Sequence, residues 1–295
     1  NLTGYRMEPT NAIVAISSGD CGDADAVVAN ETWGMENPNW TSTNGSDVSY
    51  ELGTPLVGVA GSFYRLCWGH APVGLSDYNV ELDSGAELVG PNQVTELACT
   101  LGLRCRTSLE GYRMELTNAI VAISSGRCGD ADAVVAQETW GMEHVELNST
   151  NVTNGSFGMA AYGFGTPLVG VAGSFYRLCW GHDPAGLGDF RVEVDASAEL
   201  SGPHVDDLTC TLGLPCGIEV EGYGMVSSNA IVAISSGSCG NADAVVANET
   251  WGMEYANRTH ANGSNASYAF GTPLVGVAGA FYRLCWGHNP AVLGD

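Results

Sequence analysis

Three short acidic loops carry the side chains best suited to bind a metal ion. Oxygen-bearing side chains stand two positions apart in each loop, at Asp23 and Asp25, at Asp130 and Asp132, and at Asn241 and Asp243. Oxygen ligands at alternate positions suit Ca²⁺, and Asn can replace Asp. No full calcium-loop motif surrounds them, and the alternatives are an ordinary surface turn and diffuse screening by divalent ions. A calcium site at these residues is the only cofactor that the sequence suggests.

The ten cysteines fall into four classes by local sequence. The first class follows Ser-Gly-x and holds Cys21, Cys128 and Cys239; the second follows Arg-Leu and holds Cys67, Cys179 and Cys285. The third (Cys99, Cys210) and the fourth (Cys105, Cys216) share the phrase Cys-Thr-Leu-Gly-Leu-x-Cys. Pairing the first class with the second, and the third with the fourth, uses every cysteine, whereas pairing the first with the third leaves a thiol over. We therefore predict Cys21–Cys67, Cys128–Cys179, Cys239–Cys285, Cys99–Cys105 and Cys210–Cys216.

This disulfide density indicates an oxidising, extracellular compartment. The longer loops would each contribute roughly 4 kcal/mol in the chain-entropy model, and the shorter ones roughly 2 kcal/mol. The alternative is zinc binding, but no Cys-x-x-Cys spacing is present.

N-glycosylation sequons are far more frequent than chance predicts. Eleven of the 19 Asn residues start Asn-x-Ser/Thr: Asn1, Asn30, Asn39, Asn44, Asn148, Asn151, Asn154, Asn248, Asn257, Asn262 and Asn265. Eight of them lie in one variable loop per unit, between Trp-Gly-Met-Glu and Gly-Thr-Pro-Leu. A polar, variable loop on a fixed scaffold is typical of a surface that carries glycans, although Asn and Ser are also common in loops generally. We expect covalent N-glycans and a secretory route.

No motif of a known catalytic chemistry is present. The chain lacks the nucleophile elbow, the phosphate loop, the His-Glu-x-x-His zinc motif and the dinucleotide fingerprint. His70, His182 and His288 recur in Trp-Gly-His-x-Pro, and a His at a strand end before Pro is more often structural than catalytic. We do not expect an enzyme.

These residues belong to a unit that occurs three times. Residues 12–19, 53–61 and 63–70 return almost letter for letter at 119–126, 165–173 and 175–182, and again at 230–237, 271–279 and 281–288. The period of about 110 residues matches a self-contained domain rather than a solenoid repeat. We place the three units at 1–88, 89–200 and 201–295.

Strand signals dominate each unit. Residues 190–195 and 78–83 alternate apolar and polar side chains, and residues 230–234 form a short apolar run rich in β-branched residues. Forty Gly and 11 Pro leave little room for helices. The expected fold is all-β: three tandem immunoglobulin-like (Ig-like) β-sandwiches in a rod. Residues 242–247 fit a short helix or a strand equally well.

The sequence is out of phase with the repeat. The unit that starts at Gly222 lacks a counterpart of residues 190–195, and the unit at Asn1 lacks the Cys-Thr-Leu-Gly-Leu-x-Cys hairpin. An incomplete sandwich would leave a sheet edge unpaired. We expect the edge to be filled by the continuing chain or by a strand from the next subunit; a shortened domain is the third possibility.

The phrases ending in Cys216, Glu221-Gly-Tyr, Ala-Ile-Val-Ala-Ile and Tyr-Arg-Leu-Cys-Trp together resemble the tandem Ig-like repeats of long secreted proteins of algae and other protists. Some of those proteins build extracellular fibrils or mastigoneme-type flagellar hairs. The resemblance implies a cell-surface or flagellar-surface location. The Trp beside the second-class Cys departs from the antibody pattern, in which Trp lies on a separate strand.

The net charge of the chain limits the classes of partner that we expect it to bind. With 33 acidic and 10 basic residues the formal charge is −23, and all ten basic residues are Arg. Nucleic acids and anionic membranes need a cationic face, so we expect neither as a partner. No apolar run is long enough for membrane insertion.

Near-identical units suit self-assembly, because head-to-tail contacts that do not close produce helical filaments. The sequence therefore predicts a structural, acidic, N-glycosylated protein that forms an extracellular filament with itself as partner. The alternative is a cell-surface adhesin or a glycan-binding stalk.

Overall fold

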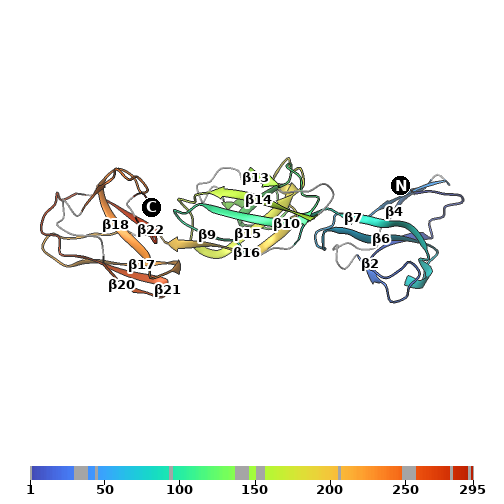
Figure 1. Ribbon diagram of the computed structural model, residues 1–295, viewed down its shortest axis with the longest axis horizontal. Coiled ribbons are helices and arrows are strands. Elements are labelled where there is room, and N and C mark those ends of the chain that lie inside the picture. The colour runs from blue at the N-terminus through green and yellow to red at the C-terminus, as the bar shows by residue number, and fades with distance from the viewer. Residues whose placement is uncertain are drawn as a thin grey trace.

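The computed structural model describes the chain except for residues 1, 30–38, 44–45, 93–95, 137–145, 151–156, 205–206, 248–256, 280–281, 292–293 and 295. Three lobes follow one another in an elongated row (Figure 1). The described elements are strands, apart from two one-turn 3-10 helices, η1 (Leu75–Asp77) and η2 (Leu187–Asp189). The prediction of an all-β chain is therefore confirmed. The unit boundaries at 88 and 200 stay predictions.

The second repeat, from β8 to β16, shows the architecture best. Its strands are β8 (Gly90–Pro91), β9 (Ala98–Thr100), β10 (Cys105–Tyr112), β11 (Ala119–Ser125), β12 (Val134–Val135), β13 (Glu146–Thr150), β14 (Phe157–Gly165), β15 (Gly173–Gly181) and β16 (Val192–Pro203). One sheet has the order β13-β14-β10-β8 and the other β12-β11-β15-β16, with β9 parallel to β16. In chain order this is the Ig-like arrangement, with strands D, E, B and A facing C′, C, F and G.

The first and third repeats contain parts of the same plan. The first has β1 (Leu2–Thr3), β2 (Asn11–Ser18), β3 (Val27–Val28), β4 (Asn39–Thr43), β5 (Asp47–Glu51), β6 (Gly61–His70) and β7 (Val80–Leu88). The third has β17 (Cys216–Met225), β18 (Asn229–Ser236), β19 (Val245–Val246), β20 (Asn257–Ala261), β21 (Gly263–Gly271) and β22 (Arg283–His288). Their sheets are β1-β5-β4 with β3-β2-β6-β7, and β17-β21-β20 with β19-β18-β22. The ambiguous segment 242–247 thus contains a strand, β19.

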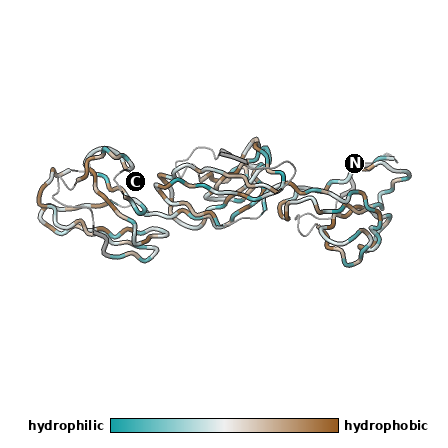
Figure 2. The backbone as a smooth tube through the Cα atoms, in the orientation of Figure 1, coloured by the Kyte–Doolittle hydropathy of each residue, from teal (hydrophilic) through white to brown (hydrophobic). Residues whose placement is uncertain are grey.

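Two apolar layers explain the continuous apolar run of β11. Ile120 and Ala122 face the main core between the sheets, where they pack with Tyr162. Val121 and Ile123 face the other way and pack beneath η2 in a second, smaller cluster. A strand buried on both faces shows no alternation of hydropathy. Apolar segments also gather where the first and second lobes meet (Figure 2).

A tyrosine fastens the corner before the F strand in each repeat. The Tyr64 hydroxyl donates to the Val59 carbonyl oxygen at 2.8 Å, and Tyr176 does the same to Val171 at 2.8 Å. In the third repeat Tyr282 donates to Val277 at 3.0 Å. This contact resembles the tyrosine corner of immunoglobulin domains, although each Tyr here precedes the Cys by three residues rather than two. The motif Phe-Tyr-Arg-Leu-Cys contained this signal, and the sequence reasoning did not use it.

Candidate functional site: the joint between repeats

Extended strands lead from each repeat into the next: the single strand β16 at the second joint, and β7 and β8, separated by Val89, at the first. β16 pairs with β15 in the second repeat, and its last residues, Gly202 and Pro203, pair with Tyr223 and Gly222 of β17 in the third. At the first joint, β7 is followed after Val89 by β8, which pairs with β10 in the same way. The connection is thus a strand held by backbone hydrogen bonds on both sides of each joint. A linker of this kind is stiff, unlike a polar Gly/Ser-rich linker.

The same side-chain contact crosses both joints. The Tyr112 hydroxyl donates to Glu87 Oε1 at 2.8 Å, and the Tyr223 hydroxyl donates to Glu199 Oε1. The hydrogen bond to Glu199 raises the pKa of Tyr223. At the first joint Arg113 also pairs with Glu87, at 2.6 Å. Glu and Tyr therefore link consecutive repeats at a fixed place.

Glycines allow the backbones to approach closely at the joints. A Cβ on Gly111 would lie 2.4 Å from the Gly90 carbonyl oxygen, and one on Gly222 would lie 2.3 Å from the Gly202 carbonyl oxygen. Both distances are below any real Cβ contact, and the opposing atom is backbone. Only glycine fits these two positions without a shift of one repeat against the other.

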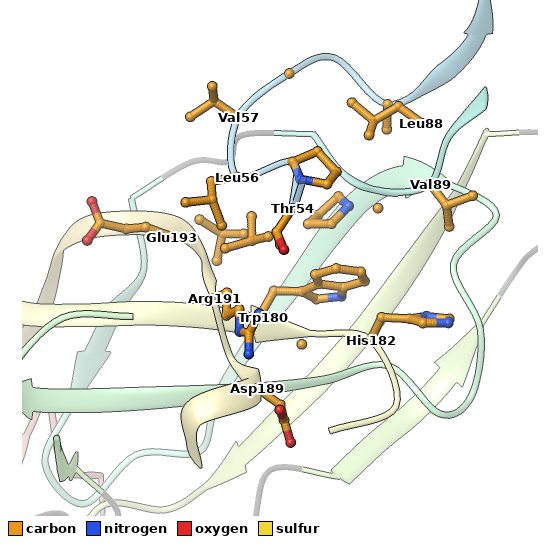
Figure 3. A pocket seen from close by; sticks show the side chains of 18 of the residues that line it. Thr54, Leu56, Val57, Leu88, Val89, Trp180, His182, Asp189, Arg191 and Glu193 are labelled. Atoms are coloured by element: carbon orange, nitrogen blue, oxygen red, sulfur yellow. The ribbon is translucent and has the colours of Figure 1, made fainter. Parts of the chain in front are cut away.

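A cavity of about 620 Å³ lies at the first joint (Figure 3). Thr54, Leu56 and Val57 reach into it from the loop of the first repeat, above Trp180 of the second repeat. Its remaining wall includes His182, Asp183, Asp189, Arg191, Glu193, Arg113 and Glu115. The volume is within the range of small-ligand sites, and the lining combines apolar side chains with His, Arg and carboxylate groups.

Two buried polar side chains lie next to residues of the cavity lining: Tyr162 beside Trp180, and Asn118 beside His182. Burial raises the pKa of Tyr162 to about 12, against a smaller opposite effect of the neighbouring Trp180 indole. His182 Nδ1 lies 2.8 Å from the side-chain amide of buried Asn118. His70 Nδ1 lies 2.8 Å from Asn11 Oδ1, and His288 Nδ1 lies 3.4 Å from Asn229 Nδ2. The recurrent His thus holds the start of the C strand.

Five disulfides link the pairs that the parity of the cysteine classes predicts: Cys21–Cys67, Cys99–Cys105, Cys128–Cys179, Cys210–Cys216 and Cys239–Cys285. The long bridges do not cross the main core as the antibody disulfide does. Cys128 and Cys179 lie in the outer cluster beneath η2. The bridge therefore joins the C–C′ turn to strand F within one sheet, while the adjacent Trp180 faces inward.

The acidic loops form surface turns. Asp23 Oδ1 accepts the Asp25 amide at 3.1 Å, Asp130 Oδ2 accepts the Arg127 amide at 2.9 Å, and Asn241 Oδ1 accepts the Asp243 amide at 2.9 Å. In the described part of the chain, no three acidic, His or Cys side chains are grouped so that they could hold a metal. The calcium site at Asp23, Asp25, Asp130, Asp132 and Asp243 stays a prediction.

The structure describes five of the eleven sequon asparagines. Asn1, Asn30, Asn44, Asn151, Asn154 and Asn248 lie outside the described residues, and only the backbone strand of Asn39, Asn148 and Asn257 is described. Asn262 and Asn265, at the β20–β21 turn, are exposed. The Asn262 Oδ1 atom accepts the Asn265 amide at 2.9 Å, which orders this turn.

Sequence reasoning missed the joint. Glu87 and Glu199 stand at matching positions, and Tyr112 and Tyr223 both occur in Glu-Gly-Tyr. The repetition of these residues was visible, but their contact depends on how consecutive repeats meet.

No family model and no curated protein matches the chain. Two solved chains of a marsupial T cell receptor are similar to it in structure. One is 10% identical with a TM-score of 0.22, over 91% of this chain and 84% of that one. The other is 11% identical with a TM-score of 0.23, over 94% and 90%. Similarity this low carries no functional argument, and the resemblance to algal and protist fibril repeats stays a prediction.

The class of protein follows from the topology and the disulfides. The strand order, the tyrosine corner and the five bridges define an Ig-like β-sandwich protein of the kind found in extracellular settings. Within the residues that the structure describes, no helix is long and apolar enough to cross a bilayer.

Proposed function

We propose that this chain is a structural subunit of an extracellular, N-glycosylated filament in which Ig-like repeats follow one another head to tail. One observation carries the proposal: the two joints use the same strand passage and the same Glu–Tyr contact. A contact that is the same at every joint can join any number of repeats. A head-to-tail contact that does not close into a ring gives a filament. The protein's main partner is then another copy of its own repeat.

Surface chemistry supports this function. Sequons are concentrated in one loop per repeat, and the two whose side chains are described, Asn262 and Asn265, are exposed. Glycans in those loops would surround the rod and keep rods apart sideways. The net charge of −23 also keeps neighbouring rods apart, because like charges repel. End-to-end association then becomes the preferred contact.

Electron microscopy of native material tests the filament. The expected image shows long fibres with a regular axial repeat and lobes of one size. Enzymatic removal of N-glycans should lower the apparent mass by many kilodaltons and leave the axial repeat unchanged. Isolated short rods in native material would contradict the filament and favour an adhesin stalk.

The second candidate, a cell-surface adhesin or glycan-binding stalk, is favoured by the cavity at the first joint. Trp180 and the donors Arg191 and His182 line it together with carboxylates, a mixture that suits sugar hydroxyls. A glycan array with the 295-residue chain tests this candidate. Arg191→Ala should abolish a specific signal, and Arg127→Ala, outside the cavity lining, serves as the matched control. Equal signals from both variants would exclude this site.

A further inference from the structure

The outer face of one sheet sets the second repeat apart from the other two. β10 and β14 lie side by side in the middle lobe (Figure 1), and their register pairs Ser108 with Ala161. Leu109 and Ala160 belong to the core between the sheets, so their neighbours along each strand face outwards. Two large apolar side chains on this outer face are about half exposed, Phe157 at 55% and Met159 at 49%. Ala161 and Gly163 continue the same row along β14.

The other two repeats are polar at the matching positions. In the third repeat, the register of β17 with β21 places Asn265, which starts a sequon, where the second repeat has Met159. In the first repeat Asp47 of β5 stands there. Both repeats form the corresponding sheet without an apolar outer face, so the fold does not require one. Exposed apolar side chains gathered on one face are typical of an interaction surface.

The charged side chains of this face are complementary to themselves. Arg106 and Glu110 face outwards from β10 on either side of Ser108, and both are exposed. Neither takes part in an ion pair within the described part of the chain. The third repeat has Gly217 and Glu221 at these two positions, so its face lacks the positive group. A face with balanced charge lowers the repulsion between two copies of a chain whose net charge is −23.

One symmetry operation brings the opposite charges together. A two-fold axis that lies in the plane of the sheet and crosses the strands at Ser108 and Ala161 reverses the strand direction in the second copy. Arg106 of each copy then opposes Glu110 of the other, which is the pattern of an isologous interface. An axis parallel to the strands would instead place Arg106 against Arg106. The charges therefore favour the antiparallel arrangement.

Side-chain size favours the same arrangement. The register places Met159 beside Glu110, and it places Gly163 beside Arg106. The axis that joins the opposite charges therefore puts the large Met159 side chain of one copy over Gly163 of the other, where no side chain stands in its way. At the centre of the contact are only the small side chains of Ser108 and Ala161.

We propose that two copies of this chain pair antiparallel through the outer faces of β10 and β14, about a two-fold axis at Ser108 and Ala161. Two sheets packed face to face keep their strands within about 30° of each other. Because β10 and β14 run along the length of the middle lobe (Figure 1), the two rods lie alongside each other in opposite directions. The contact goes beyond the proposed function, because it joins rods sideways, whereas the filament needs only the joints between repeats.

Chemical cross-linking tests the proposal on the glycosylated 295-residue chain. The ten native cysteines are all paired, so Ser108→Cys adds one free thiol that the axis places opposite the same thiol of the second copy. Packed sheets lie about 10 Å apart, a distance that a short bismaleimide spans and a direct disulfide does not. Glu219→Cys is the matched control, because Glu219 has the same register in the third repeat. We expect at least tenfold more covalent dimer from Ser108→Cys.

Charge reversal tests the symmetry of the contact. In the Ser108→Cys background, Arg106→Glu places like charges opposite each other and should lower the dimer yield about tenfold, because juxtaposed like charges oppose association. Adding Glu110→Arg exchanges the two charges in both copies and should restore the yield. Restoration also shows that the variants fold. A yield that stays low in the doubly reversed variant would contradict the antiparallel arrangement.

The alternative occupant of this face is a glycan of the same chain. Cross-linking of Ser108→Cys that appears only after enzymatic removal of N-glycans would show that the chain's own glycans cover Phe157 and Met159, and would overturn the proposal. Equal yields from Ser108→Cys and Glu219→Cys would indicate random collision and overturn it too.

Failure of this inference is distinguishable from failure of the proposed function. Native filaments without a specific cross-link at Ser108 would refute the sideways contact and leave the filament. A specific cross-link without native filaments would leave the sideways contact and refute the filament.

Discussion

The Tyr223 hydroxyl donates a hydrogen bond to the Glu199 carboxylate across the joint between the second and third repeats. Tyr112 and Glu87 repeat this relationship at the first joint. Each pair joins the last residues of one G strand to the B strand of the next repeat. The joint therefore combines strand pairing with a charge-assisted hydrogen bond.

Removing one hydroxyl should loosen one joint. We expect Tyr223→Phe to broaden the distribution of end-to-end distances measured by small-angle scattering, with a stability loss below about 1 kcal/mol because the pair is partly exposed. Tyr5→Phe is the matched control, because Tyr5 stands at the same position of the first repeat and is 84% exposed. An unchanged distance distribution for Tyr223→Phe would show that strand pairing alone sets the joint.

Adding a methyl group at the joint should disturb the joint more than removing the Tyr223 hydroxyl does. In Gly222→Ala the new Cβ meets the Gly202 carbonyl oxygen at 2.3 Å, so the pairing of β16 with β17 must open. Amides near the joint should then exchange faster, as hydrogen exchange measured by mass spectrometry can detect. Gly186→Ala is the control, because nothing lies within 4 Å of its Cβ and its φ of −157° suits any residue.

Asp195 and Asp83 occupy the same position in two repeats and should respond differently to Ala. Asp195 Oδ2 accepts the amide of Leu97, which is distant in sequence, whereas Asp83 Oδ1 accepts the amide of the nearby Gly85. Asp195→Ala should leave the Leu97 amide beside β9 without this acceptor and cost about 1.5–3 kcal/mol, the range for a hydrogen bond to a charged group. Asp83→Ala should cost less than about 0.5 kcal/mol, as at an ordinary surface site. Urea unfolding measures both, and equal losses would contradict the role of Asp195.

The two kinds of disulfide should differ in stabilisation. Replacing Cys128 and Cys179 by Ala opens a loop with a separation of 51 residues, worth roughly 4 kcal/mol; replacing Cys99 and Cys105 opens one of 6 residues, worth roughly 2 kcal/mol. Guanidinium unfolding of the two double variants should give this order. The reverse order would mean that local packing, rather than loop entropy, controls the effect.

Alkaline pH should destabilise the second repeat through Tyr162. Burial raises the pKa of this phenol from 10.0 to about 12, so the folded state favours the neutral form. The resulting stabilisation is complete below pH 10 and is lost as pH rises from about 10 to about 12, where only the unfolded chain ionises freely. Tyr162→Phe should flatten this part of the stability curve. A curve with the same slope in the variant would assign the effect to other groups.

The sequence predicted the strands better than the places where they meet. Alternation in residues 78–83 and 190–195 identified parts of β7 and β16, and the apolar run 230–234 lies within β18. Cysteine parity predicted the pairs, but not that Cys179 faces the outer layer while Trp180 faces the core. Which of the two residues faces the core depends on the pleat of β15. Because both faces of this sheet are apolar, the hydropathy pattern of the sequence does not reveal it. The joint depends on contacts between repeats, which no periodicity within one repeat encodes.

The strand shared by two repeats also determines how a pulling force would travel. Tension along the chain enters β16 at one joint and loads its backbone hydrogen bonds to β15 and β17 in shear, so many of them must break together. The bridge from Cys128 to Cys179 closes a loop with a sequence separation of 51 residues, and this loop adds no length even after a repeat unfolds. Under tension, such a repeat would unfold only at high force and would lengthen little when it unfolds. Both properties suit a tether that must keep its length.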